Sequence, residues 1–396
     1  MITAERLWLY PRALLVAVFV AIGLSAFTTE ATGGRLGGDL PAFYGISRMV
    51  LAGDFEHLYD VEAQTAVETD LFVGDTDGGF LPFIYPPYTA VAVAPLSLLP
   101  FRAAYFAYTA LMIAAVALGV RWFARDLPWL SRDRTAVFAG VFLFHPMFRA
   151  ATGAQNTAWT FACIVGSHAL VQANRPWLAG LALGGTWLKP QFAVPLIGLH
   201  LLSGEWRTFL AAMGMGGLAW GVAAAVCGPD WVPTWIAQAT AFQALDQHVN
   251  SANSVSWLGF TEAVLGAGNP VALVAGWAAA LATIAVMAWV WFRGIADRAE
   301  RLGIAALGTL MISPHGMFYD AGLAVVPLLV LLDREKQRAA WLVAGLWLLS
   351  QFHPLNHAIG VTPVFPVCAI AFGWAVWHAV SPPKAPVVAV IPTSGA

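Results

Sequence analysis

The sequence predicts an all-α polytopic membrane protein, as its composition and a long series of apolar segments indicate. Hydrophobic residues make up 59% of the 396 positions and charged residues only 11%. In an ordinary soluble domain, about 25% of the residues are charged. The net charge of −2 gives no reason to expect nucleic acid as a partner. We therefore expect the chain to fold in contact with membrane lipids.

The first apolar segment, residues 11–28, follows two arginines and is compatible with a cleaved signal peptide. The apolar segments after it favour instead an uncleaved helix whose N-terminus lies in the cytoplasm. Several of them are shorter than the roughly 20 residues of a straight crossing, so we expect broken helices or polar flanks to complete them. The later segments cover about 103–122, 136–150, 157–172, 177–188, 190–203, 208–227, 269–292, 302–312, 317–332, 339–352 and 361–380.

Three arginine-rich loops predict the orientation, because positive residues concentrate in cytoplasmic loops. Placing all three in the cytoplasm gives about 12 transmembrane helices with both termini inside, provided that residues 83–100 do not cross. Prolines interrupt that segment, which is typical of a juxtamembrane or re-entrant helix. In the alternative topology residues 83–100 cross and residues 177–203 cross once, which puts the first loop outside. The three loops contain Arg121, Arg125, Arg132 and Arg134, then Arg293, Arg298 and Arg301, then Arg334, Lys336 and Arg338.

The preferred topology leaves two long segments outside, about 29–82 and 229–268. The first is too polar to face lipid and too long for a turn, so we expect juxtamembrane helices in it. In the second, tryptophans lie among carboxamides and carboxylates, which suits either sugar rings or an interfacial aromatic belt. We expect residues 1–380 to form one integral membrane domain and residues 381–396 to form a disordered cytoplasmic tail.

A set of polar residues falls on the extracytoplasmic side, although none of them was used to choose that side. Ionisable groups at membrane depth are costly and usually line a cavity or a site. We therefore interpret the set as an active site. Its members are Asp39, Arg102, Gln155, Asn156, Lys189, Gln191, His315, Tyr319, Asp320, His353 and His357.

Neither a cofactor nor a metal is expected. His353 and His357 have the spacing of helical metal ligands, but Pro354 argues against a regular helix there. The glycines at 180, 184 and 185 lie in an apolar segment, where close helix packing explains them better than phosphate binding. The three cysteines lie in or beside apolar segments without a CxxC pair, so they indicate neither a disulfide nor a metal site.

Seven short motifs follow one another along residues 39–320. They are Asp39 with Tyr44, Leu58-Tyr59-Asp60, Phe83-Ile84-Tyr85-Pro86-Pro87, Gln155-Asn156, Ala179-Gly180 leading to Leu188-Lys189-Pro190-Gln191, Gly228 with Trp231, and Ser313-Pro314-His315 with Tyr319-Asp320. In this order they resemble glycosyltransferase family 87, whose members are GT-C-type membrane enzymes. Where the family commonly reads Gly-Gln-x-Asn, this chain has Gly153-Ala154-Gln155-Asn156.

The resemblance implies a GT-C-like fold and an inverting, polyprenyl-phosphate-sugar-dependent hexosyltransferase of the inner (plasma) membrane. Such an enzyme moves a hexose, usually mannose, from a polyprenyl-phosphate sugar to a hydroxyl of a lipid or glycan acceptor on the extracytoplasmic side. The family's proposed general base, an aspartate of the first loop, carries over to Asp39.

The residues support this chemistry in their own right. A sugar hydroxyl is a poor nucleophile until a carboxylate such as Asp39 accepts its proton. The leaving lipid phosphate needs positive partners rather than a general acid, and we expect these to be Lys189, His315 and Arg102. A carboxylate without a second one paired to it argues against a retaining double displacement. The residues that we expect to bind the substrates are Tyr44, Tyr85, Gln155, Asn156, Gln191, Tyr319 and Asp320.

Other interpretations stay open. The main one is a transporter or flippase for a sugar-lipid or small solute, although no second copy of the Asp39 loop or the Lys189 break is visible. A ligase or polymerase of similar architecture would differ only in its acceptor. Asp39 is also compatible with a helix cap, Lys189 with a snorkelling side chain, Arg102 with an interface anchor, and His315 with a bond to a freed carbonyl.

Overall fold

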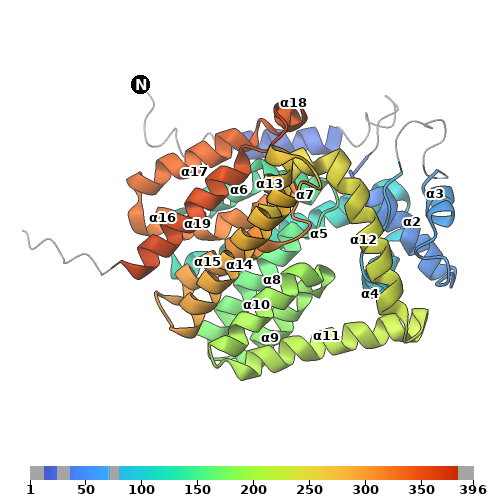
Figure 1. The fold of residues 1–396 in the computed structure, drawn as a ribbon, viewed down its shortest axis with the longest axis horizontal. Coiled ribbons are helices and arrows are strands. Elements are labelled where there is room, and N and C mark those ends of the chain that lie inside the picture. The colour runs from blue at the N-terminus through green and yellow to red at the C-terminus, as the bar shows by residue number, and fades with distance from the viewer. Residues whose placement is uncertain (1–12, 25–35, 70, 72–79, 382–396) are drawn as a thin grey trace, which may run out of the picture.

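The computed structural model describes residues 13–24, 36–69, 71 and 80–381 (Figure 1). Within this part the chain is all helical, apart from one isolated β-bridge between Ser254 and Met317. The tail predicted beyond Ser381 and the stretches 25–35 and 72–79 of the predicted first loop lie outside the described residues. The predicted all-α class is confirmed for the described residues.

Each predicted apolar segment becomes a helix or a broken pair of helices. Breaks occur at residues 143–144, between α6 and α7, and at Lys189, after the short helix η4, whereas η6 runs directly into α16. The bounds are Ala13–Leu24, α5 Phe101–Phe123, α6 Arg134–Phe142, α7 His145–Thr152, α8 Thr157–Gln172, α9 Pro176–Gly184, η4 Gly185–Leu188, α10 Pro190–Leu202, α11 Trp206–Cys227, α14 Pro270–Phe292, α15 Arg298–Ile312, η6 Phe318–Ala324, α16 Val325–Glu335, α17 Gln337–Ser350 and α19 Val364–Val380.

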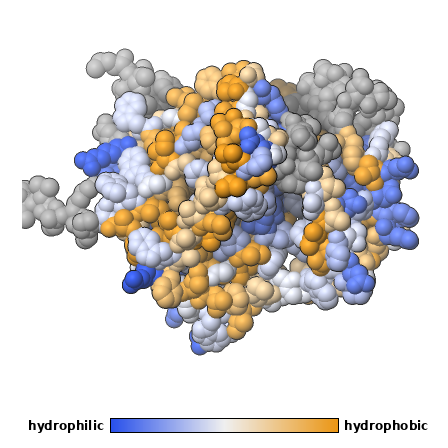
Figure 2. All heavy atoms as spheres, in the orientation of Figure 1, coloured by the Kyte–Doolittle hydropathy of each residue, from blue (hydrophilic) through white to orange (hydrophobic). Residues whose placement is uncertain are grey.

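Among the described residues, three helices are long and apolar enough to cross a membrane: Phe101–Asp126, Trp206–Cys227 and Pro270–Phe292. A fourth span results if His353–Ile359 and Val364–Val380, which are bent by 106°, count as one. The chain is thus an all-α membrane protein, and the number of 12 crossings stays a prediction. In Figure 2, hydrophobic residues spread across the middle of the face shown, while hydrophilic residues gather at its right edge over α2 and α3.

Helices occupy the described parts of the two segments predicted to lie outside, and α4 and η1 lie in residues 83–100. On the right of Figure 1, α12 stands beside α2, α3 and α4. The indole Nε1 of Trp235 on α12 donates to the carbonyl of Ile84 at 2.9 Å, which ties the second outside segment to residues 83–100. The bounds of these helices are α2 Leu40–Leu51, α3 Val61–Thr69, α4 Pro87–Val93, η1 Ala94–Leu98, α12 Trp231–Asn250, η5 Ser251–Asn253 and α13 Trp257–Leu265, and the remaining short helices are η2 Ala124–Asp126, η3 Leu130–Asp133, η7 His353–Leu355 and α18 Asn356–Ile359.

The glycines of α9 serve close helix packing, as predicted. A Cβ on Gly180 would lie 2.3 Å from the carbonyl oxygen of Thr208, and one on Gly184 would lie 2.5 Å from the Cβ of Met215. α9 therefore packs tightly against α11. At its far end α11 stops at Gly228, whose φ of 83° and ψ of 163° suit glycine, and α12 turns away from it (Figure 1).

Four helices, α8, α10, α15 and α16, run between the same two ends of the bundle. We call one end, formed by residues 37–39, 153–157, 185–191 and 313–320, the cavity end. The opposite end, formed by residues 124–134, 203–205, 293–301 and 333–338, is the arginine end. α8, with 16 residues, is roughly 24 Å long, so the two ends are separated by most of a bilayer's hydrocarbon thickness.

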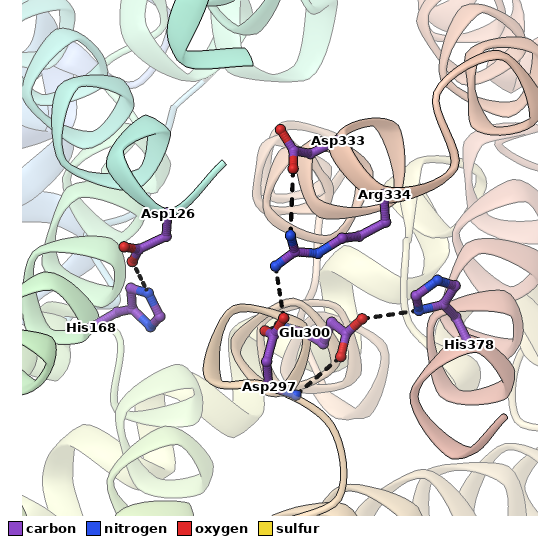
Figure 3. A network of polar contacts seen from close by, with 7 residues as sticks. All are labelled: Asp126, His168, Asp297, Glu300, Asp333, Arg334 and His378. Atoms are coloured by element: carbon purple, nitrogen blue, oxygen red, sulfur yellow. Dashed lines mark hydrogen bonds and ion pairs between the residues drawn. The ribbon is translucent and has the colours of Figure 1, made fainter. Parts of the chain in front are cut away.

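The three arginine-rich loops meet at the arginine end. The carboxylate of Asp333 accepts from the backbone N–H of Trp129 at 2.8 Å, and the Arg334 guanidinium bonds Asp297 at 2.7 Å. Figure 3 shows Asp297, Asp333 and Arg334 together with the pairs Asp126–His168 and Glu300–His378. The alternative topology separated loop 121–134 from the other two. The structure brings residues of all three loops together at one end of the bundle, and the side of the membrane that this end faces stays a prediction.

Candidate active site

A cavity of about 570 Å³ opens at the cavity end. Its walls are the start of α2, the extended segment 80–86, the break before α10, one face of α12 and residues 315–319. Ligand pockets of proteins have this size, and a few polar groups in mostly apolar walls fix the ligand. Of the predicted site residues, the cavity brings together Asp39, Tyr85, Lys189, Gln191, His315 and Tyr319.

Asp39 sits where two loops dock backbone to backbone. Its N–H donates to the carbonyl of Gly153 at 3.1 Å. A Cβ on Gly38, which has a φ of +58°, would lie 2.9 Å from the same carbonyl oxygen. Asp39 occupies the N-cap position of α2, but its side chain makes no capping hydrogen bond. The geometry thus disfavours the helix-cap interpretation of this carboxylate.

The Asp39 side chain is held by Gln155, whose Nε2 donates to Oδ2. The hydroxyl of Tyr85 donates to Oε1 of Gln155 at 3.3 Å, so three side chains form one chain of hydrogen bonds. Burial, assisted by the negative charges of Asp39 and Asp320, raises the pKa of Tyr85 well above its ordinary value. Tyr85 therefore remains a neutral donor.

Lys189 lies at the turn between η4 and α10, where Pro190 begins the new helix. Its Nζ lies 2.6 Å from Oδ1 of Asp320, and the two side chains are 4% and 0% exposed. Asp320 also accepts from the hydroxyl of Thr157 at 2.9 Å. A snorkelling lysine extends its ammonium group into water. The Lys189 ammonium ends instead on a buried carboxylate, although its side chain still lines the cavity.

His315 reaches the cavity from the segment after α15. Its ring centroid lies 5.8 Å from that of Phe242 on α12. The next residues are fixed by residues 254–255, since the N–H of Val255 donates to the carbonyl of Gly316 at 2.8 Å. This arrangement closes the cavity between α12 and the end of α15.

Five predicted substrate-binding or phosphate-binding residues do not line the cavity. The Tyr44 hydroxyl donates to the carbonyl of Leu99 at 2.8 Å. Phe43 lines the cavity, and the next residue of α2 points about 100° further round the helix. Arg102 lies in the first turn of α5, Asn156 is buried at the start of α8, and Asp320 lies behind Lys189. Gln155 likewise acts from behind the wall.

The predicted histidine pair contacts other partners. His353 stacks on Phe318 with ring centroids 3.9 Å apart, and His357 bonds Asn253 at 3.1 Å. Among the described residues, no group of three histidine, cysteine, aspartate or glutamate side chains is placed to hold a metal ion.

Sequence reasoning missed part of the α12 wall. Trp235, Gln238 and Phe242 all line the cavity, and their spacing of three and four residues is that of one helix face. This periodicity within residues 229–268 is the signal by which the sequence could have revealed them. Gln64 was missed as well, and it bonds the backbone of Leu58 and Phe83 from within the cavity wall.

Comparisons with known proteins identify similar glycosyltransferases. The polyprenol-phosphate-mannose-dependent alpha-(1-2)-phosphatidylinositol pentamannoside mannosyltransferase of Mycolicibacterium smegmatis is 27% identical over 311 residues, 71% of each chain. Its counterpart from Mycobacterium tuberculosis is 29% identical over 71% of this chain and 68% of its own. An alpha-(1->3)-arabinofuranosyltransferase of M. tuberculosis is 27% identical over 33% of this chain and 31% of its own. No solved structure matches the chain.

The family model described as glycosyltransferase family 87 matches residues 83–314, more than half of the sequence. This range includes the Tyr85, Gln155 and Lys189 motifs. The chain therefore belongs to glycosyltransferase family 87.

Proposed function

We propose that this glycosyltransferase moves a hexose, with mannose as our first choice, from a polyprenyl-phosphate sugar to a hydroxyl of a lipid or glycan acceptor. The observation that carries the proposal is the Asp39 carboxylate, which opens into a cavity of about 570 Å³ beside Lys189. The names of the mycobacterial relatives support the choice of donor, because both describe enzymes dependent on polyprenol-phosphate mannose.

Asp39 acts as the general base. The acceptor hydroxyl gives its proton to the carboxylate while its oxygen forms a bond to the anomeric carbon of the donor. The bond from that carbon to the phosphate oxygen breaks on the opposite face, and its electron pair leaves with the polyprenyl phosphate. Asp39 is the one carboxylate among the described residues that line the cavity. This is consistent with inversion in a single displacement.

Lys189 and His315 stabilise the departing phosphate. A lysine ammonium has three N–H donors, and the bond to Asp320 occupies one of them. Lys189 can therefore bind phosphate without leaving its partner. In a cavity shielded from water, such a charge-assisted hydrogen bond stabilises the developing anion more than it would in bulk solvent. Gln191 and Tyr319 line the same space and contact the sugar.

The cavity end faces the extracytoplasmic side of the inner (plasma) membrane. The clustered positive residues of the arginine end support this orientation, because such residues mark cytoplasmic loops. Helices of the lengths seen here are consistent with a cavity near the opposite membrane surface, where a lipid-linked sugar presents its head group.

Purified protein incubated with radiolabelled polyprenyl-phosphate mannose and a glycolipid extract tests the proposal. We expect label to move to the acceptor with the anomeric configuration opposite to that of the donor. Polyprenyl-phosphate arabinose and glucose in parallel reactions test the choice of sugar. Label that crosses a vesicle membrane on its intact donor, without transfer, would support a transporter instead, and retained configuration would contradict the single displacement.

A further inference from the structure

A buried carboxamide connects two residues of the cavity wall. Gln155 is 2% exposed and does not line the cavity, whereas Asp39 and Tyr85 both do. Its Nε2 bonds the Asp39 carboxylate, and its Oε1 accepts from the Tyr85 hydroxyl. Gln155 is therefore placed to act on Asp39 rather than on a substrate, which differs from the sequence-based expectation.

The direction of the Gln155 amide is determined by its neighbours. A carboxamide presents an acceptor on one side and donors on the other. An ionised carboxylate only accepts, so the amide nitrogen faces Asp39, and the amide oxygen then accepts from the Tyr85 hydroxyl. The reversed amide would place its oxygen against the carboxylate oxygen, and both atoms carry negative charge.

Backbone hydrogen bonds hold Asp39 and Gln155 in place beside each other. Asp39 N bonds the carbonyl of Gly153, and Gln155 N bonds the carbonyl of Ala150 at 2.9 Å. The two loops are thus joined both by a backbone bond and by the side-chain bond two residues later. Catalytic groups need a supporting shell of this kind to hold productive geometry.

We propose that Gln155 is a positioning residue that keeps Asp39 ionised and oriented for proton abstraction, and that Tyr85 holds the oxygen end of its amide in place. The inference rests on the proposed function, in which Asp39 is the base. A donor that bonds the charged form of a carboxyl favours that form, so the base is available at lower pH. Gln155 itself gives up no proton.

Other titratable groups surround Asp39 and must be separated from its behaviour. Tyr108 of α5 interacts with it electrostatically, Tyr85 precedes α4, and Lys189 and His315 line the same cavity. His315 is the one whose ordinary titration range overlaps neutral pH. The acid limb of the pH profile is therefore measured both in the wild type and in His315→Gln.

The test is the pH dependence of kcat/KM for Gln155→Leu. We expect the acid limb to move to higher pH by about one unit and kcat to fall about 10-fold to 100-fold. The KM values for donor and acceptor should stay within about threefold, because the side chain touches neither. Tyr85→Phe should shift the limb in the same direction by less, and should shift it no further when added to Gln155→Leu.

Asn356→Leu is the matched control. Asn356 is a carboxamide that is 0% exposed and bonds Asn253 and His353 outside the cavity, so its loss should lower thermal stability without moving the acid limb. An unmoved limb in folded Gln155→Leu, or a rise in KM at unchanged kcat, would overturn the inference. If Gln155→Leu does not fold, the acid limb of Tyr85→Phe is the test. A shift to higher pH supports the inference, and an unmoved limb overturns it.

The two proposals fail differently. Full activity in Asp39→Asn would remove the base and with it the proposed function. An inactive Asp39→Asn combined with an unmoved limb in the Gln155 variant would remove only the positioning role.

Discussion

The two ends of the helix bundle use charged residues in opposite ways. At the cavity end, the Lys189 and Asp320 side chains are 4% and 0% exposed and bond each other and hydroxyl or backbone groups. At the arginine end, Arg334 and Asp297 are 31% and 46% exposed and join loops from different parts of the chain. Pairs of basic and acidic side chains therefore lie in a buried, low-dielectric environment at the cavity end and in a solvent-exposed, high-dielectric environment at the arginine end.

The difference in exposure suits the buried pair to a role in chemistry and the exposed pairs to a role in membrane orientation. Removing one partner of a buried pair leaves a charge without compensation, so such pairs persist where the charge has a use. Exposed pairs are screened by water and contribute little to stability. Their positive excess is nevertheless enough to fix the side of the membrane on which a loop stays. The following substitutions should affect the two ends very differently.

The largest effect is expected for Asp39→Asn at the cavity end. Asparagine keeps the shape of aspartate but cannot accept the acceptor's proton, so transfer should fall by about 10²–10⁴-fold. Donor binding and thermal stability should remain near those of the wild type, because the side chain does not cap α2. Glycosyl transfer and thermal unfolding measured side by side check this. Wild-type turnover would exclude Asp39 as the base.

Lys189→Met should destabilise the protein by about 3–5 kcal/mol, because it leaves the Asp320 carboxylate buried without a counter-charge. Adding Asp320→Asn should restore part of this stability, whereas transfer should stay low because the phosphate ligand is still missing. Unfolding of the single and double variants in the same detergent measures the difference. Equal stability of Lys189→Met and wild type would show that the carboxylate finds another partner or a proton.

The arginine end should respond to acid through Glu205, which precedes α11. Burial alone raises the pKa of this carboxyl, but the bonds and charges of His200 and Arg298 outweigh burial and lower the pKa to about 2. The folded pKa lies below the ordinary value of 4.5, so Glu205 adds stability above that pH and loses it as the pH falls towards 2. The melting temperature should therefore fall more steeply with decreasing pH over this range in the wild type than in Glu205→Gln.

The smallest effect is expected for Asp297→Asn. Its ion pair with Arg334 is largely exposed, Arg334 keeps Asp333 at 3.6 Å, and asparagine caps α15 about as well as aspartate, so we expect a loss of at most about 1 kcal/mol, and less at high salt. Activity should not change. A loss comparable to that of Lys189→Met would mean that the arginine end is as dry as the cavity end, and the contrast between the two would disappear.

Sequence patterns predicted the features that depend on neighbouring residues. The break at Lys189 follows from Pro190, and the gathering of the arginines follows from the positive-inside rule. Register within α2 could also have shown that Phe43, rather than Tyr44, shares the direction of Asp39, since four residues bring a helix back to nearly the same face.

Contacts between distant residues could not be predicted in this way. Gln155 meets Asp39 across 116 positions, and Asp320 meets Lys189 across 131. A polar residue that lies on the correct side of the membrane can touch the substrate or support a residue that does. Only the packing of α8, α10 and η6 against one another decides between these roles for Gln155 and Asp320.

The turn at Gly228 makes the shape of the cavity depend on one pair of backbone torsions. α12, which carries Trp235 and Gln238, leaves α11 at this glycine, and a Cβ there would have no atom within 4 Å. Space therefore permits a larger residue, but a φ of 83° with a ψ of 163° is a conformation that other residues adopt only under strain. A substitution would relieve that strain by rotating α12 about the turn at residue 228. The volume open to the sugar would then change through a residue that never contacts it.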